Sequence, residues 1–186
     1  AYGTNVVAGF SAYMQVDGFN ILPILSFSMA ATTFVGQNIG AGQRKRAFQG
    51  AAIIFLIHLC YTLMMQDIML GFDTQIISAF SKEPEVITSG VMCIWALAPF
   101  YSVLGVIHSL AGALRGTGDT MGPMAIILIS LCLFRVIWIW TMTSTIDGVR
   151  GVYLTYPASF VLGAVLMVIY VLFKDHRSKQ KKEKLW

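Results

Sequence analysis

The sequence places two ionisable side chains, Asp17 and Arg135, deep inside long apolar stretches. A charge at membrane depth is costly, so such a residue is a candidate for a functional site. A carboxylate there can bind and release a proton or Na⁺, whereas a nearby arginine can lock it into a static ion pair. We hypothesise that the two side chains approach each other, because their expected depths differ by only about 3 Å. A static pair, a switchable pair and no contact remain three open alternatives.

Aromatic and histidine side chains in the same stretches offer two further kinds of chemistry. Trp95, Phe100 and Tyr101 could line a cleft for an organic cation, which aromatic faces attract, or could pack against lipid and other helices. His58 and His108 could relay protons, but hydrogen-bonded helix packing is the simpler interpretation. The candidate pathway residues are therefore Asp17, Arg135, Trp95, Tyr101 and His108.

Nothing in the sequence predicts a metal site, a cofactor or an enzyme. The three cysteines (Cys60, Cys93 and Cys132) lack CxxC spacing, and no histidine lies three or four residues from a carboxylate within an apolar stretch. No group of acid, histidine or serine residues has the spacing of a catalytic site within one leaflet. We therefore expect a protein that carries no cofactor and transforms nothing chemically.

Long helices must position these residues, because the composition is that of a membrane protein. Of the 186 residues, 56% are hydrophobic and 12% charged, about half the charged share of soluble domains. A soluble domain of this length could not bury so much apolar side chain. We predict an all-α, polytopic membrane bundle. Its five spanning helices, each long enough to cross a hydrocarbon core, are 12–33, 47–67, 89–112, 122–142 and 152–173.

Basic residues predict the orientation of this bundle in the membrane. With five spans, the first loop, the third loop and the C-terminal tail share one side, which carries ten Lys and Arg residues against two on the other. By the positive-inside rule that side is cytoplasmic, including the basic tail 174–186. The tail also fits a nucleic-acid patch, but a juxtamembrane run that contacts anionic lipid is the preferred interpretation, so no nucleic acid is expected as a partner.

Prolines and glycines predict where helices kink and where the chain turns. Pro23 and Pro99 lie mid-span, where each removes a backbone hydrogen bond and should kink its helix. Two glycine-rich segments, TFVGQNIGAGQRKRA at 33–47 and GALRGTGDT at 112–120, are typical of tight turns between antiparallel helices. Neither segment matches GxxxxGK[ST] or follows a strand, so nucleotide binding is not expected.

A longer pattern joins these segments. The stretch from Tyr13 to Phe27 has the form Y-x-x-x-D-x-F-x-x-x-P-x-x-S-F, and it runs into TTFVGQNIGAG, with LAGALRGTGDTMGP further on. At these relative positions the motifs resemble the second half of a multidrug and toxic compound extrusion (MATE) family transporter, over essentially the whole chain. The resemblance implies two six-helix lobes that face each other across a cleft. This chain would supply five helices of the second lobe and would lack the N-terminal lobe.

The resemblance also implies a function. It implies a secondary antiporter of the inner membrane that exports cationic, amphipathic drugs and toxins in exchange for Na⁺ or H⁺ by alternating access. Its partners would be the small-molecule substrates, the lipid bilayer and the missing lobe. The motif residues would be hinge and lobe-packing elements at the cytoplasmic gate, with Arg115 and Asp119 able to pair locally. They are Gly36, Gln37, Gly40, Arg115, Gly116, Gly118 and Asp119.

The charged residues within the spans bear on the ion site and on two alternative functions. Some family members carry an acid in the tenth helix, but the matching span 89–112 has none, so a carboxylate site of that kind is not expected here. A lipid-linked saccharide flippase of related architecture would need several basic residues in its cavity, and the spans offer only Arg135. A structural membrane subunit fits the hydropathy equally well, and only the motifs argue against it. With so few charges inside the spans, we expect most of the coupling chemistry in the missing half.

Overall fold

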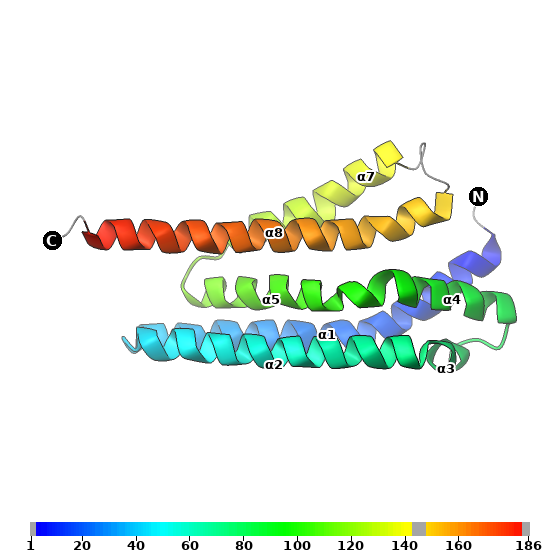
Figure 1. The fold of residues 1–186 in the computed structure, drawn as a ribbon, viewed down its shortest axis with the longest axis horizontal. Helices are drawn as coiled ribbons and strands as arrows, with labels where there is room; N and C mark the ends of the chain where they lie inside the picture. Colours follow the sequence, from blue (N-terminus) through cyan, green and yellow to red (C-terminus); the bar gives the residue numbers. More distant parts are fainter. Residues whose placement is uncertain (1–2, 143–147, 184–186) are drawn as a thin grey trace.

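The computed structural model describes residues 3–142 and 148–183, and within these ranges the chain is helical and forms no strand (Figure 1). A 3₁₀ turn at Ala98–Phe100 separates α4 from α5, and a π-helical segment at Leu128–Leu133 separates α6 from α7. The helices are α1 (Thr4–Gly40), α2 (Arg44–Gly71), α3 (Asp73–Ser78), α4 (Pro84–Leu97), α5 (Tyr101–Gly116), α6 (Met121–Ile127), α7 (Phe134–Met142) and α8 (Gly148–Glu183).

Five helical stretches in the described residues are long and apolar enough to cross a membrane, which confirms the predicted all-α class and the predicted number of spans. They are Thr4–Gly40, Arg44–Gly71, Pro84–Gly116, Met121–Thr141 and Tyr153–Lys174. Helices α1, α2 and α8 extend beyond the expected spans, because polar residues at the ends of a span can continue its helix into water. The basic segment expected as a tail accordingly continues α8 as far as Glu183.

The two mid-span prolines affect their helices differently. At Pro99 the α-helix gives way to the 3₁₀ turn, as expected where a backbone donor is missing. Pro23 lies inside α1 without ending it. The π-helical segment was not predicted, and Arg135 follows it by two residues. Such π-helical turns are rare and often occur at functional sites.

Helix α1 packs against α2, α4 and α5, while α8 packs against α5 and α7. In Figure 1 the α1–α2 turn, the α5–α6 turn and the C-terminal end of α8 lie at the same end of the bundle. This agrees with the predicted grouping of the first loop, third loop and tail on one side. The antiparallel order therefore brings α1 and α5, distant in sequence, side by side.

Small residues allow α5 to approach α1 closely. Gly112 and Gly116 form a GxxxG pair, a pattern that lets membrane helices pack backbone to backbone. A Cβ atom on Gly116 would lie 2.6 Å from the Val35 Cβ and 2.7 Å from the Thr32 carbonyl oxygen. Because the two helices lie so close together, Thr32 Oγ1 of α1 donates a hydrogen bond of 3.0 Å to the Gly112 carbonyl of α5. The contact thus combines van der Waals packing with interhelical hydrogen bonding.

His58 joins three helices inside the bundle. It is fully buried, its Nδ1 lies 2.6 Å from Ser109 Oγ of α5, and its ring stacks on Phe27 of α1 with centroids 4.8 Å apart. These contacts confirm the interpretation of His58 as a hydrogen-bonded packing residue.

Candidate functional site

A cavity of about 250 Å³ lies where α1, α4, α5, α7 and α8 converge. Four of the five predicted pathway residues line it: Asp17, Tyr101, His108 and Arg135. The remaining lining residues are Tyr13, Met14, Ile21, Leu97, Leu104, Leu131, Tyr156 and Phe160. Residues far apart in sequence therefore form one aromatic-walled site with two opposite charges.

Two tyrosine hydroxyls hold the carboxylate of Asp17. Tyr13 Oη donates a hydrogen bond of 3.3 Å to Asp17 Oδ1, and Tyr101 Oη donates to the same oxygen. The two hydroxyls lie 2.6 Å from each other, and both tyrosines are almost completely buried. Asp17 Oδ2 accepts no hydrogen bond from the described residues, so one carboxylate oxygen remains available to a ligand.

Arg135 is held on the other side of the cavity by α8. Its Nε donates a hydrogen bond of 2.9 Å to Ser159 Oγ, and its guanidinium carbon lies 4.4 Å from the Tyr156 ring centroid. Within residues 3–142 Asp17 and Arg135 form no ion pair, which corrects the idea of a static pair. Each charge has polar or aromatic partners of its own, so the two share a cavity without contacting one another.

A buried amide beside Asp17 was not predicted. Asn20 is only 2% exposed, and neither its amide nitrogen nor its amide oxygen has a hydrogen-bond partner in the described part of the chain. Tyr13, Asp17 and Asn20 are spaced i, i+4 and i+7, which places them on one face of α1. This spacing is a sequence signal that could have identified both neighbours of Asp17. No such local signal pointed to Tyr156 and Ser159, which lie in α8.

Trp95 does not contribute to the aromatic wall, which corrects its inclusion among the pathway residues. It is 58% exposed, and its Nε1 donates a hydrogen bond of 2.8 Å to Asp73 Oδ2. This hydrogen bond lowers the pKa of the Asp73 carboxyl below its usual value. Tyr101 does line the cavity, and Tyr156 and Phe160 of α8 complete its aromatic surface together with Tyr13.

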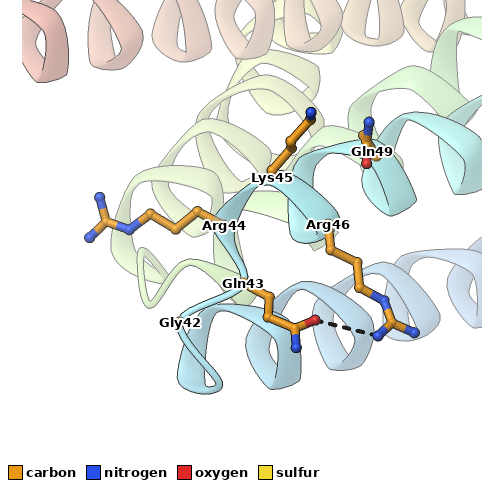
Figure 2. Close-up of a pocket in the computed structure, with 6 residues that line it drawn as sticks. All are labelled: Gly42, Gln43, Arg44, Lys45, Arg46 and Gln49. Carbon is orange, nitrogen blue, oxygen red and sulfur yellow. Dashed lines mark hydrogen bonds between the residues drawn. The ribbon is translucent and has the colours of Figure 1, made fainter.

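The first glycine motif forms the turn between α1 and α2. Gly42 has φ +74°, a backbone conformation that favours glycine, while Gln37 and Gly40 are exposed at the end of α1. A surface pocket of about 580 Å³ lies at this turn, and residues 42–46 and Gln49 line it (Figure 2). Arg46 donates a hydrogen bond of 3.4 Å to Gln43 Oε1, whereas the side chains of Arg44 and Lys45 extend away from that pair (Figure 2). The predicted basic loop is therefore a surface-exposed cationic turn.

The second glycine motif connects three helices at the same end. Gly118, with φ +90°, makes the turn after α5, and a Cβ atom on Gly36 of α1 would lie 3.6 Å from the Gly116 carbonyl oxygen. Arg115 and Asp119 do not pair with each other, contrary to the expectation. Arg115 Nη2 donates to Ser28 Oγ at 2.9 Å, while Asp119 Oδ2 accepts from Lys174 Nζ of α8 at 2.5 Å. The motif thus joins α5 to α1 on one side and to α8 on the other.

The MatE family model matches residues 1–141 of this chain. The chain belongs to the MatE family. A probable multidrug resistance protein NorM of Thermotoga maritima is 25% identical over 91% of this chain. The multidrug resistance protein PmpM of Pseudomonas aeruginosa is 33% identical over 67% of it. A FAD transporter of Shewanella oneidensis is 28% identical over 85% of it.

Solved structures agree with the MatE assignment. An outward-facing multidrug resistance MATE family transporter superposes with a TM-score of 0.85 over 97% of this chain, at 16% identity. An inward-facing one gives a TM-score of 0.80 over 92% of this chain, at 14% identity. The chain spans 37% of the Thermotoga relative and 41% of the outward-facing structure. It is therefore a multi-pass membrane protein of a transporter family that corresponds to part of its relatives' length.

The contact between Asp119 and Lys174 gives this MatE chain an acid-sensitive link. The hydrogen bond from Lys174 holds the pKa of the Asp119 carboxyl below its usual value, and the Tyr170 hydroxyl adds a second hydrogen bond of 2.7 Å. The carboxylate form therefore stabilises the fold above about pH 4, the unfolded value. That contribution is lost as the pH falls through the lowered pKa of the folded protein.

We expect Asp119→Asn to lower the unfolding free energy at neutral pH by about 0.5 kcal/mol, as for other solvent-screened pairs. Thermal unfolding of the detergent-purified protein between pH 7 and pH 3 would measure the difference from wild type. The difference should shrink as the pH falls below about 4 and should be lost below the lowered pKa of the folded protein, where Asp119 is protonated in both states. The reciprocal variant Lys174→Met should show the same trend. A difference that stays constant with pH would rule out this electrostatic link.

Proposed function

We propose that the chain is the second-lobe part of a secondary active antiporter that exports cationic, amphipathic small molecules in exchange for Na⁺ or H⁺. Transport would proceed by alternating access in the plasma (inner) membrane, with the C-terminus in the cytoplasm and an N-terminal lobe as partner. The observation that supports this proposal is the half-buried Asp17 carboxylate in an aromatic-walled cavity at membrane depth. The membership of the MatE family supports the transport class.

Asp17 can couple two ligands because they compete for the same charge. A carboxylate that holds a proton or Na⁺ is neutralised and no longer attracts an organic cation. The hydroxyls of Tyr13 and Tyr101 place further oxygen atoms beside Asp17, and hard cations prefer oxygen ligands. An ion that binds one conformation better than the other shifts the population between inward-facing and outward-facing states. Because the ion and the organic cation cannot occupy Asp17 together, transport of one is exchanged for transport of the other.

The aromatic surface suits the organic part of the cargo. Tyr13, Tyr101, Tyr156 and Phe160 line the cavity, and aromatic faces attract organic cations. Among the described cavity residues Arg135 is the one arginine or lysine, so the cavity does not favour a lipid-linked pyrophosphate. A drug-like cation therefore fits this lining better than the cargo of a flippase.

Uptake of a fluorescent cationic dye into everted vesicles that contain the full-length protein would test the proposal. We expect accumulation that requires an imposed Na⁺ or pH gradient and that falls to the level of protein-free vesicles when an ionophore collapses the gradient. The gradient that supports uptake identifies the coupling ion. Accumulation that is absent under both gradients would refute antiport.

A further inference from the structure

We propose that Arg135 forms a subsite for the carboxylate of a zwitterionic substrate, so that the cavity recognises molecules that carry an acid as well as a cation. This inference rests on the proposed transport function and names a substrate class within it. Arg135 would then be a specificity-determining residue.

Most N–H donors of the Arg135 guanidinium form no hydrogen bond to a described residue. Arginine carries five N–H donors in a planar fork, and Nε uses one of them for Ser159 Oγ. The two terminal nitrogens donate to no residue that the structure describes. Their four N–H groups match the two oxygens of a carboxylate, which arginine binds in bidentate fashion.

Aromatic rings fix the orientation of this fork. The guanidinium carbon lies 4.4 Å from the Tyr156 centroid and 5.3 Å from the Phe160 centroid. Together with the Ser159 hydrogen bond, these contacts restrain the guanidinium before any ligand binds. A preorganised donor loses less conformational entropy on binding, so an acid would bind it more tightly than a free arginine side chain.

Arg135 also has no counter-ion among the residues that the structure describes, although one would be expected. At membrane depth an unpaired charge is costly, and Asp17, the acid in the same cavity, is held by Tyr13 and Tyr101 instead. Cation–π contacts offset part of that cost but leave the net charge in place. A bound carboxylate would neutralise it.

The two opposite charges favour a zwitterion over a simple cation. A protonated amine could pair with Asp17 while a carboxylate pairs with Arg135, and the rings between them could contact an aromatic body. A molecule with only a positive charge would leave Arg135 without a counter-ion, so it would gain less from the cavity than a zwitterion of similar shape. A volume of about 250 Å³ is small beside drug-sized pockets, so the cavity would take the charged end of a larger molecule.

A pair of rhodamine dyes that differ at one group would test this subsite in the full-length protein. One dye has a free benzoate and a cationic ring system, and the other is its methyl ester, which is cationic only. For Arg135→Gln we expect gradient-driven vesicle uptake of the free acid to fall about tenfold or more, the size of a lost charge-assisted interaction. Uptake of the ester should stay within about twofold or rise, because that dye makes no use of the guanidinium.

Two further variants separate recognition from folding. Arg135→Lys keeps the charge but loses the bidentate fork, so we expect a partial and selective loss of free-acid uptake. Ser159→Ala removes the hydrogen bond that restrains Arg135 and should weaken free-acid uptake in the same direction. If Arg135→Gln fails to reach the membrane, these variants provide the comparison.

The outcomes distinguish this inference from the proposed function. Equal losses of both dyes in Arg135→Lys and Ser159→Ala, or no loss of either, would overturn the carboxylate subsite. Wild-type protein that transports the ester but not the free acid would also overturn it while leaving antiport intact. Wild-type protein that transports neither dye under any gradient would contradict the proposed function itself.

Discussion

Full-length transporter that carries Asp17→Asn is expected to fold and insert normally but to lose gradient-driven uptake of a cationic dye. Asparagine has the same shape and still accepts hydrogen bonds from Tyr13 and Tyr101. It cannot carry a negative charge, so it pairs with neither an organic cation nor Na⁺ and cannot be protonated. A lost charge-assisted interaction of about 1.5–3 kcal/mol corresponds to a decrease of about ten- to a hundredfold.

Asp67→Asn is the matched control for this experiment. Asp67 is also an aspartate in a spanning helix, but it is exposed on α2 and does not line the cavity. We expect its removal to leave uptake unchanged. Unimpaired transport by Asp17→Asn, with normal amounts of protein in the membrane, would show that Asp17 has only a structural role.

Gly116→Ala is expected to destabilise the bundle because it adds a methyl group where α1 and α5 pack closely together. The new Cβ would lie 2.6 Å from the Val35 Cβ and 2.7 Å from the Thr32 carbonyl oxygen. A backbone atom cannot move aside as a flexible side chain can, so the helices must separate. We expect the free energy of unfolding to fall by about 1–3 kcal/mol, as for other overpacked sites. Thermal unfolding of detergent-purified protein measures this change.

Gly40→Ala provides a closely matched comparison. Gly40 is the last residue of α1 as Gly116 is the last residue of α5, and neither has a positive φ. A Cβ atom on Gly40 meets nothing within 4 Å. We expect this variant to be neutral or slightly stabilised, since alanine has less conformational freedom to lose than glycine. Equal stability of the two variants would exclude close helix packing as the role of Gly116.

The sequence alone predicted the helical architecture, because membrane spans follow from local composition. An apolar stretch of about twenty residues must be helical in lipid, where no water can satisfy its backbone. The five predicted spans correspond to five long apolar helices in the described residues. The glycine motifs likewise indicated the family before any fold was known, and the match of residues 1–141 to the MatE model confirms it.

The sequence also predicted that the two charged side chains within the spans approach each other. Asp17 and Arg135 line one cavity, as their similar positions along the membrane normal suggested. The positions of these two residues in the sequence did not predict which side chains bind them. Tyr101 lies 84 residues from Asp17, and Ser159 lies 24 residues from Arg135.

Only the tertiary structure decided these pairings, and the reason is geometric. Residue counting along a span gives depth, but contact also depends on the rotation of each helix about its axis and on which helices are neighbours. Both are determined by the packing of the whole bundle, including the GxxxG contact at Gly112 and Gly116 and the π-helical segment before Arg135. The sequence therefore determined which residues belong to the spanning helices. Packing decided that Asp17 binds tyrosines, that Arg135 binds Ser159, and that both face one cavity without forming an ion pair.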